Sequence, residues 1–158
     1  MRRQVLQTEI SQFKEAINET YNLAAKKPKI TVVIVNKRIT QRFFVEDEQG
    51  RLQNPPSGCL IDTGVVENSD SNHEYDFYLV PQNATQGCVL PTHFYVAYND
   101  STMSKETLEK FTYDLCHYYF NWAGPIKVPA PCMYAHKIAE LYMNIGKDSD
   151  TRHYTAEL

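Results

Sequence analysis

The sequence predicts a single domain of the mixed α/β class, with one helix first, about five strands next and two helices last. Its 158 residues are the length of one ordinary domain, and 42% of them are hydrophobic, which is enough to bury a core. Apolar residues recur at helical spacing near both ends of the chain, whereas the stretch between is rich in β-branched and aromatic residues. We find no internal repeat and no linker. We therefore expect one mixed sheet of about five strands with three main helices.

Composition excludes several classes of protein. The formal net charge is only −3, so any basic surface must be local. The four cysteines form no CxxC pair and have no zinc-type spacing with histidine. Because no signal peptide is visible either, we expect reduced thiols in an intracellular protein of the cytoplasm or nucleus, or both. No apolar run approaches the roughly 20 residues that span a bilayer, so we expect no membrane partner.

The first helix is predicted over residues 3–25. Apolar residues recur there every three or four positions, on one face of a helix. They are Leu6, Ile10, Phe13, Ile17, Tyr21 and Ala24. The pattern starts almost at Met1, without a cap or a preceding strand, so the chain looks as though it begins inside a larger unit.

The strands are predicted from apolar runs that polar, turn-forming segments separate. Residues 30–35 are β-branched and apolar throughout. Such a run is typical of a central strand covered on both faces. The other runs occupy residues 43–45, 59–66, 75–80 and 93–98, and residues 46–58 form a polar excursion.

A second helix should begin at Ser104, whose side chain suits an N-cap, and end in the segment 121–125. Its predicted buried stripe comprises Leu108, Phe111, Leu115, Tyr119 and Trp122.

The third helix is predicted over residues 128–146. Pro129 and Pro131 suit its first turn, and Gly146 suits its end. His136 lies on the border between an apolar side and a narrow polar side. The apolar side is formed by Tyr134, Ile138, Leu141, Tyr142 and Ile145. The remaining tail is polar.

From the residues alone, His136 has three interpretations. It is an ordinary core or surface residue, a ligand for a divalent metal ion, or the partner of Cys132 in a nucleophilic pair one helical turn apart. Asp62 and Asp76, at a strand end and inside a strand, are either metal carboxylates or structural residues. The sequence does not show that these groups converge. His117 lies inside the second helix and is interpreted as structural.

Lys37, Arg38 and Arg42 place three cations in one connection between strands. This connection is either a solvated turn or a contact for phosphate, to which lysine offers a point charge and arginine a two-pronged donor. His93 and Lys127 could extend the same track.

Several segments carry specific motifs, among them QNPPSG, YYFNW and VPAPCxYAHK. In order, the segments are TVVIVNKRITQRFF, GRLQNPPSGCLIDTGVV, EYDFYLVPQ, PTHFYVAYND, TYDLCHYYFNW and VPAPCMYAHKIAEL. From about residue 10 to residue 146, their order and spacing resemble the C-terminal part of the PIWI domain of Argonaute/Piwi proteins, and the Piwi branch in particular.

The resemblance implies an RNase H-like fold and small-RNA-guided silencing of complementary transcripts. In the members that cleave RNA, three acidic residues and a fourth Asp or His bind two divalent ions, Mg²⁺ or Mn²⁺. His136, in YAHK, matches the fourth position, and the acidic residues lie upstream of Met1 in the family. Asp62 and Asp76 match none of them, which withdraws both as metal candidates. We therefore expect this chain alone to be unable to cleave RNA.

The resemblance also assigns contacts to the guide RNA. Lys37 and Arg38 match a lysine–arginine pair that touches guide phosphates. His93 or Tyr95 matches a second contact region, and Lys127 stands where a small polar residue often contacts phosphate. Arg42 belongs to the same basic connection. Leu141 replaces an arginine that contacts the guide's 5′ phosphate in the Argonaute branch, so that contact does not carry over.

On this resemblance, residues 1–158 are the C-terminal portion of a PIWI domain, with a polar tail at 146–158. The carboxylate of Leu158 would join a metal at the guide's 5′-phosphate pocket, as in the Piwi branch. The expected partners are a guide RNA, its RNA target, the rest of the PIWI domain and the MID domain. The isolated chain should expose apolar surface and self-associate. The alternative function is a catalytically inactive protein-interaction module on the same fold.

Overall fold

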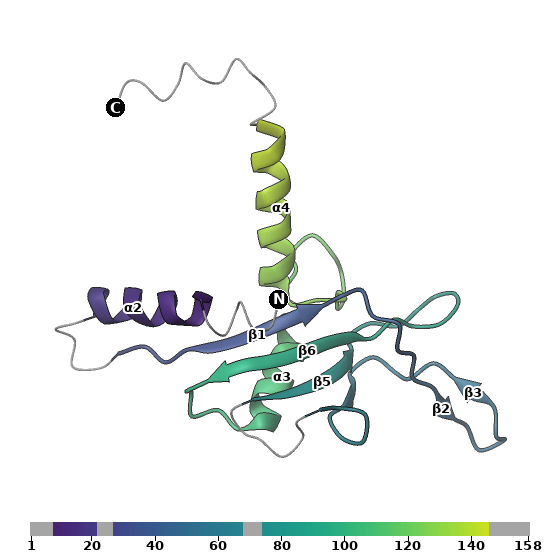
Figure 1. Cartoon of the computed structure of the whole chain (residues 1–158). Helices are drawn as coiled ribbons and strands as arrows, with labels where there is room; N and C mark the ends of the chain where they lie inside the picture. Colours follow the sequence, from purple (N-terminus) through teal and green to yellow (C-terminus); the bar gives the residue numbers. More distant parts are fainter. Residues whose placement is uncertain (1–7, 22–26, 68–73, 146–158) are drawn as a thin grey trace.

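The computed structural model describes residues 8–21, 27–67 and 74–145. Its centre is a four-stranded sheet with a helix packed on each face, and a third helix projects from one end (Figure 1). The predicted α/β class is confirmed. The helices are α2 (Ile10–Thr20), α3 (Lys105–Leu115) and α4 (Ala130–Ile145), and the strands are β1 (Thr31–Asn36), β2 (Val45–Glu46), β3 (Leu52–Gln53), β4 (Cys59–Ile61), β5 (Tyr75–Val80) and β6 (Thr92–Asn99).

The main sheet has the strand order β1-β6-β5-β4, and all of its neighbouring pairs are antiparallel. We expected a mixed sheet with the first strand at its centre. Instead, β1 lies at the edge of the described sheet and is only half-buried, while β5 is buried along its whole length. A β-branched, apolar run indicates a strand, but its neighbours are set by residues far away in the sequence.

Alternate residues of β6 contribute to two cores, one on each face of the sheet, and β5 contributes to the first of them. Phe77 and Phe94 face each other in register and their rings stack at 5.1 Å, on the side covered by Leu108 of α3. Tyr95 and Ala97 face the other side and meet Ile10, the one described residue of α2 that is buried. Aromatic pairs of this kind add about 0.5–1.5 kcal/mol beyond the area that they bury.

Helix α3 begins as predicted, and its buried face overlaps the predicted stripe only in part. The Ser104 side chain accepts a hydrogen bond from the Thr107 backbone N–H, as an N-cap should. The helix ends at Leu115, several residues before the predicted end, and Phe111 and Trp122 of the predicted stripe are exposed. Leu108 of that stripe is buried as predicted, and Glu109 and Thr112 are buried beside it.

The predicted polar excursion contains an ordered hairpin and an anchored turn. The hairpin pairs β2 with β3 and was not predicted. After it, Asn54 donates to the carbonyl of Gly87 and accepts from the N–H of Val89. Ser57 donates to the carbonyl of Pro81 and lies 3.2 Å from the Tyr113 hydroxyl. The QNPPSG motif therefore joins the loop before β6 to α3.

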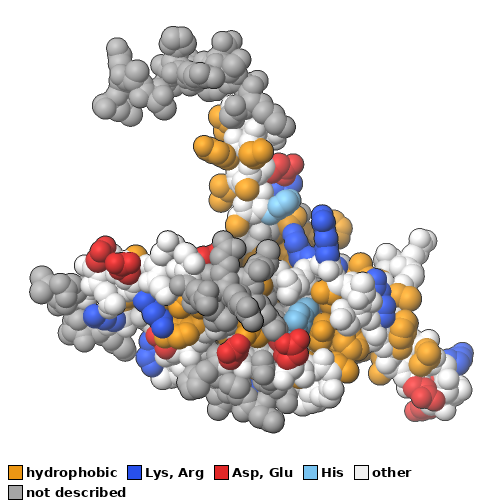
Figure 2. All heavy atoms as spheres, viewed as in Figure 1, with side chains coloured by type: hydrophobic (Ala, Val, Ile, Leu, Met, Phe, Trp, Pro, Cys, Tyr) orange, Lys and Arg blue, Asp and Glu red, His pale blue; other side chains and the backbone are white. Residues whose placement is uncertain are grey.

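Helix α4 stands away from the sheet and leaves its apolar side uncovered (Figures 1 and 2). Ile138 is 67% exposed and Tyr142 is 76% exposed, although both lie on the side predicted to be apolar. The start at Ala130, after Pro129, agrees with the prediction, and the predicted end at Gly146 lies outside the described residues. None of the helices in the described segments has the length and apolarity needed to cross a membrane.

Candidate nucleic-acid interface

The basic connection predicted at Lys37, Arg38 and Arg42 lies directly after β1. All three side chains are exposed. Arg42 donates from Nη1 to the carbonyls of Ile39, at 3.2 Å, and Gln41, at 2.7 Å. Arg42 therefore helps to shape the loop that presents the other two cations.

Lys127 approaches this loop from a distant part of the chain. Its Nζ donates to the carbonyl of Lys37 at 3.0 Å, and its own carbonyl accepts from Thr92 Oγ1 at 2.8 Å. Partial burial lowers the pKa of Lys127, and the charges of Arg42 and Lys37 lower it further. An anion bound beside these cations would relieve their mutual repulsion. Figure 2 shows Lys and Arg side chains gathered at the base of α4.

The first turn of α4 adds to this positive region. The N-terminus of a helix carries a partial positive charge, which favours anions. Lys37 is close enough to this turn to affect Cys132: burial raises the pKa of the Cys132 thiol, and the Lys37 charge offsets this only in part. A thiol with a raised pKa stays protonated at neutral pH. The raised pKa does not favour Cys132 as the nucleophile of a Cys/His pair.

His93 lies beside the interface in a network of side chains. Its Nε2 is 2.8 Å from Asp76 Oδ2, its Nδ1 is 3.4 Å from Asn36 Nδ2, and its ring stacks on Tyr78 at 4.5 Å. The side chain is 15% exposed. Tyr95, the alternative contact in this region, is buried, and its hydroxyl donates to the Glu74 carboxylate. His93 is thus the one of the two that retains access to a ligand.

His136 lies on α4, one turn after Cys132, and its side chain is exposed. Within residues 8–21, 27–67 and 74–145, no group of three or more His, Cys, Asp or Glu side chains is arranged to hold a metal ion. Asp62 Oδ2 pairs with Lys105 at 3.1 Å, and Asp76 is buried against His93. The described residues therefore do not by themselves fit the two-metal site that the resemblance implies. Leu158 lies outside the described residues.

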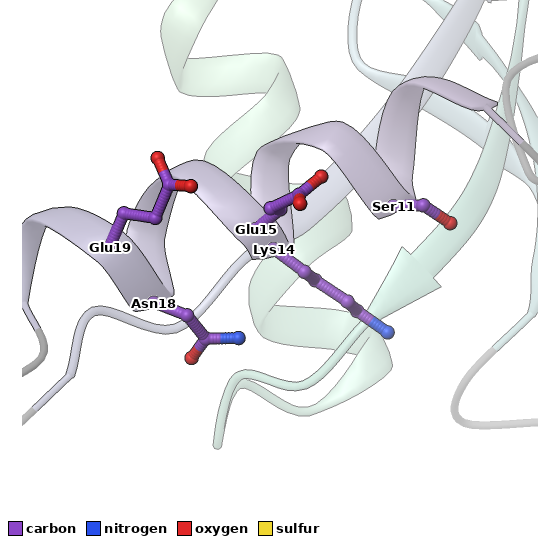
Figure 3. Close-up of a pocket in the computed structure, with 5 residues that line it drawn as sticks. All are labelled: Ser11, Lys14, Glu15, Asn18 and Glu19. Carbon is purple, nitrogen blue, oxygen red and sulfur yellow. The ribbon is translucent and has the colours of Figure 1, made fainter.

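A separate, shallow hollow of about 620 Å³ runs along α2 (Figure 3). Every residue that lines it belongs to that one helix, and all are exposed. They are Ser11, Lys14, Glu15, Asn18 and Glu19. Because its charges have mixed sign and no second element encloses it, we place the candidate site at the base of α4 instead.

Sequence reasoning missed the residues that hold this interface together. Asn36 and Asp76 position His93, and Thr92 holds the backbone at Lys127. Of these supporting residues, only Asn36 had a local signal in the sequence, because it ends the strand immediately before Lys37. Their convergence depends on the pairing of β1 and β5 with β6.

The comparisons with known proteins now decide the family. A model of the Piwi domain matches residues 1–147. The chain belongs to the Piwi domain family. The resemblance read from its motifs is thereby confirmed.

Curated relatives of this Piwi segment include Piwi-like protein 1 of Gallus gallus, 42% identical over 136 residues, and Piwi-like protein 1 of Danio rerio, 46% identical over 115 residues. These matches cover 84% and 73% of the segment but only 14% and 13% of the two relatives. The segment therefore spans about one seventh of the length of such proteins.

Two solved structures share its fold. The crystal structure of Drosophila Piwi matches with a TM-score of 0.76 and 36% identity, over 88% of the segment and 18% of that chain. Kluyveromyces polysporus Argonaute with a guide RNA matches with a TM-score of 0.68 over 88% of the segment and 18% of that chain. At 23% identity, the second match supports the fold alone.

Proposed function

We propose that this Piwi segment binds the phosphate backbone of a small guide RNA and works as part of a small-RNA-guided silencing protein. Its RNA partners in that role are the guide and a complementary target. Family membership supports the silencing role, and a similar fold occurs in an Argonaute crystallised with a guide RNA. The remainder of the PIWI domain and a MID domain are the proposed protein partners.

One observation carries the proposal: the hydrogen bond from Lys127 to the carbonyl of Lys37. It brings cations from two distant parts of the chain beside the positive end of α4. Solvated lysines on an ordinary surface repel one another and spread apart. Here the fold holds Lys127 near Lys37 and Arg42, and partial burial, followed by these two charges, lowers the pKa of Lys127, which is a cost to its charged form. A phosphate group would compensate that cost.

The test is RNA binding by the complete chain, measured by fluorescence anisotropy with a labelled single-stranded RNA over a range of salt concentrations. We expect the double variant Lys37→Ala/Arg38→Ala to bind more weakly. The slope of log K against log salt should become shallower by about 0.7 for each lost phosphate contact. Lys29→Ala/Lys110→Ala is the matched control, because it removes the same charge from exposed positions elsewhere.

The salt slopes separate the two candidate functions. If both double variants lose RNA affinity and salt slope equally, the RNA is attracted only by the overall charge of the surface. That result would contradict a specific phosphate site at Lys37 and Arg38. Absence of RNA binding in the unmodified chain would favour the second candidate, a protein-interaction module. The exposed apolar side of α4 is the observation that supports this second candidate.

RNA cleavage is proposed only for a longer protein that contains this segment, with His136 as one ligand of a divalent-metal site. The test compares metal-dependent cleavage of target RNA by the longer protein with that of its His136→Ala variant. We expect the variant to lose cleavage and to keep guide binding. Cleavage by the 158-residue chain alone would overturn this division of roles.

A further inference from the structure

A cavity of about 320 Å³ lies between the edge of the main sheet and α3, lined by residues that the RNA interface does not use. Its volume is at the lower end of the range for ligand pockets, about 300–1,000 Å³. Most of its wall is apolar. The lining residues are Gly58, Leu60, Asp62, Leu79, Glu106, Glu109, Lys110 and Tyr113.

Glu109 is the unusual member of this lining. Its side chain is 3% exposed, and its Oε1 atom has no hydrogen-bond partner among the described residues. The Tyr75 hydroxyl is the other buried side-chain atom in the described residues without such a partner, and burial, followed by the charge of Glu109, raises the pKa of Tyr75. A buried polar atom left without a partner costs about 1–3 kcal/mol, and more when it is charged. Glutamate is almost never fully buried unless it is paired. A donor bound in the cavity that Glu109 lines would satisfy this carboxyl group.

The surrounding charges favour a cation as that donor. Asp62 faces the cavity from the sheet side and is bound by Lys105, while Glu106 and Lys110 lie on α3. The pKa of Glu109 is raised to about 7, chiefly by burial and then by the charges of Asp62 and Glu106, which Lys105 offsets only in part. A positive group beside Glu109 would reverse these effects.

The apolar wall sets the shape of the ligand. Leu60, Leu79 and the ring of Tyr113 suit an aliphatic stem rather than a bare ion. Gly58 keeps one side open, because a Cβ there would lie 3.3 Å from the Tyr113 ring. The orphaned acceptor is a single oxygen, which suits a point donor such as an ammonium better than the two-pronged guanidinium.

We propose that this cavity binds the side chain of a lysine presented by a partner protein, with its ammonium group on Glu109 and its stem against Leu60 and Leu79. The proposal does not rest on RNA binding, because neither Lys37 nor Lys127 lines the cavity.

The test is an NMR titration of the ¹⁵N-labelled chain with lysine blocked at both its α-amino and carboxyl groups. We expect saturable shifts at the amides of α3 around Glu109. The same compound acetylated on its ε-nitrogen has the stem without the charge and should bind at least about tenfold more weakly, since it loses a charge-assisted bond. Glu109→Gln should weaken binding of blocked lysine by a similar factor. Glu48→Gln, an exposed glutamate in the hairpin turn, should have no effect.

Leu60→Trp provides a second variant that retains Glu109 and fills the cavity. If Glu109→Gln fails to fold, loss of binding in Leu60→Trp supports the proposal, and unchanged binding overturns it. Equal binding of the acetylated and unacetylated compounds would reveal a merely apolar hollow and would also overturn it. The proposal is equally wrong if the folded Glu109→Gln variant binds as well as the unmodified chain, or if no shifts appear around α3.

Discussion

Lys127 donates a hydrogen bond from its Nζ to the backbone carbonyl of Lys37, 3.0 Å away, although 90 residues separate them in the sequence. This bond joins the loop after β1 to the segment that leads into α4. It also explains why a lysine fits at this position, since a shorter side chain could not reach the carbonyl. The loop geometry and the positive charge at the base of α4 therefore depend on the same atom.

Lys127→Met removes both the bond and one charge from the interface. We expect amide hydrogen exchange in residues 37–42 to become several-fold faster, because the loop loses its anchor. The salt slope of RNA binding should fall by about 0.7, the value for one phosphate contact. Lys37→Ala is the matched comparison, since it removes one charge but keeps the carbonyl acceptor. Its slope should fall equally without faster exchange, and identical exchange in the two variants would contradict the anchoring role.

Gly58 is held in a backbone conformation that other residues rarely adopt, with φ of +86°, and a Cβ there would lie 3.3 Å from the Tyr113 ring. Gly58→Ala should therefore lower the free energy of unfolding by about 1–3 kcal/mol, from backbone strain together with crowding. Urea unfolding followed by circular dichroism measures the loss.

Gly64→Ala separates these two causes. Gly64 has a similar φ of +76°, but a Cβ there would meet nothing within 4 Å. Gly64→Ala should lower the free energy of unfolding only by the backbone strain, about 1 kcal/mol. If Gly58→Ala and Gly64→Ala lower the free energy of unfolding equally, crowding against Tyr113 does not contribute to the loss.

Local chemistry made much of this fold predictable. Ser104 marked the start of α3 because its side chain caps the helix by itself, without help from the rest of the chain. The buried stripe was predicted only in part, because packing against the sheet selects the buried face: Leu108 and Tyr119 are buried, but Phe111 and Trp122 are not. Thr112 is buried there and Phe111 is not, and Thr112 satisfies its hydroxyl by donating to the Leu108 carbonyl. Spacing cannot show that a polar residue will find such a partner within its own helix.

The candidate interface was likewise predictable only in part. Lys37 and Arg38 were found because neighbouring cations in a short connection are visible in the sequence. Their approach to Lys127 was not, because it follows from the pairing of β1 with β6 and from the hydrogen bond of Thr92, in β6, to the carbonyl of Lys127. The position of β1 at the edge of the described sheet was not predicted for the same reason, since residues far away in the sequence determine which strands pair. The sequence therefore showed where the cations lie along the chain, but it did not show that they come together in the fold.

The exposed side of α4 predicts self-association of the isolated chain. Ile138 and Leu141 are 67% and 59% exposed, and exposed apolar side chains that lie together favour association. Sedimentation velocity should show sizes that grow with concentration, and Ile138→Glu/Leu141→Glu should shift the protein toward monomer. Lys137→Gln/Glu140→Gln changes a salt-bridged pair on the same helix and should leave association unchanged. A monodisperse monomer for the unmodified chain would refute the prediction.

Glu109 should make stability fall as pH rises. Its pKa is about 7 in the folded protein, against an ordinary value of 4.5, and burial is the main cause. Between these values the folded state holds a proton that the unfolded state has released. The stabilisation is therefore complete below about pH 4.5 and is lost as pH rises through about 7. At about 1.4 kcal/mol for each pKa unit, the loss is on the order of 3 kcal/mol.

Glu109→Gln removes this titration while keeping the size and shape of the side chain. Urea unfolding at pH values between about 5 and 8 should give a flatter stability profile for the variant, and a more stable protein at the upper end. Glu48→Gln is the control, because Glu48 is exposed and should leave the slope unchanged. If the two variants show the same pH profile, Glu109 is not protonated in the folded protein, and another cation or a bound water must satisfy its buried oxygen.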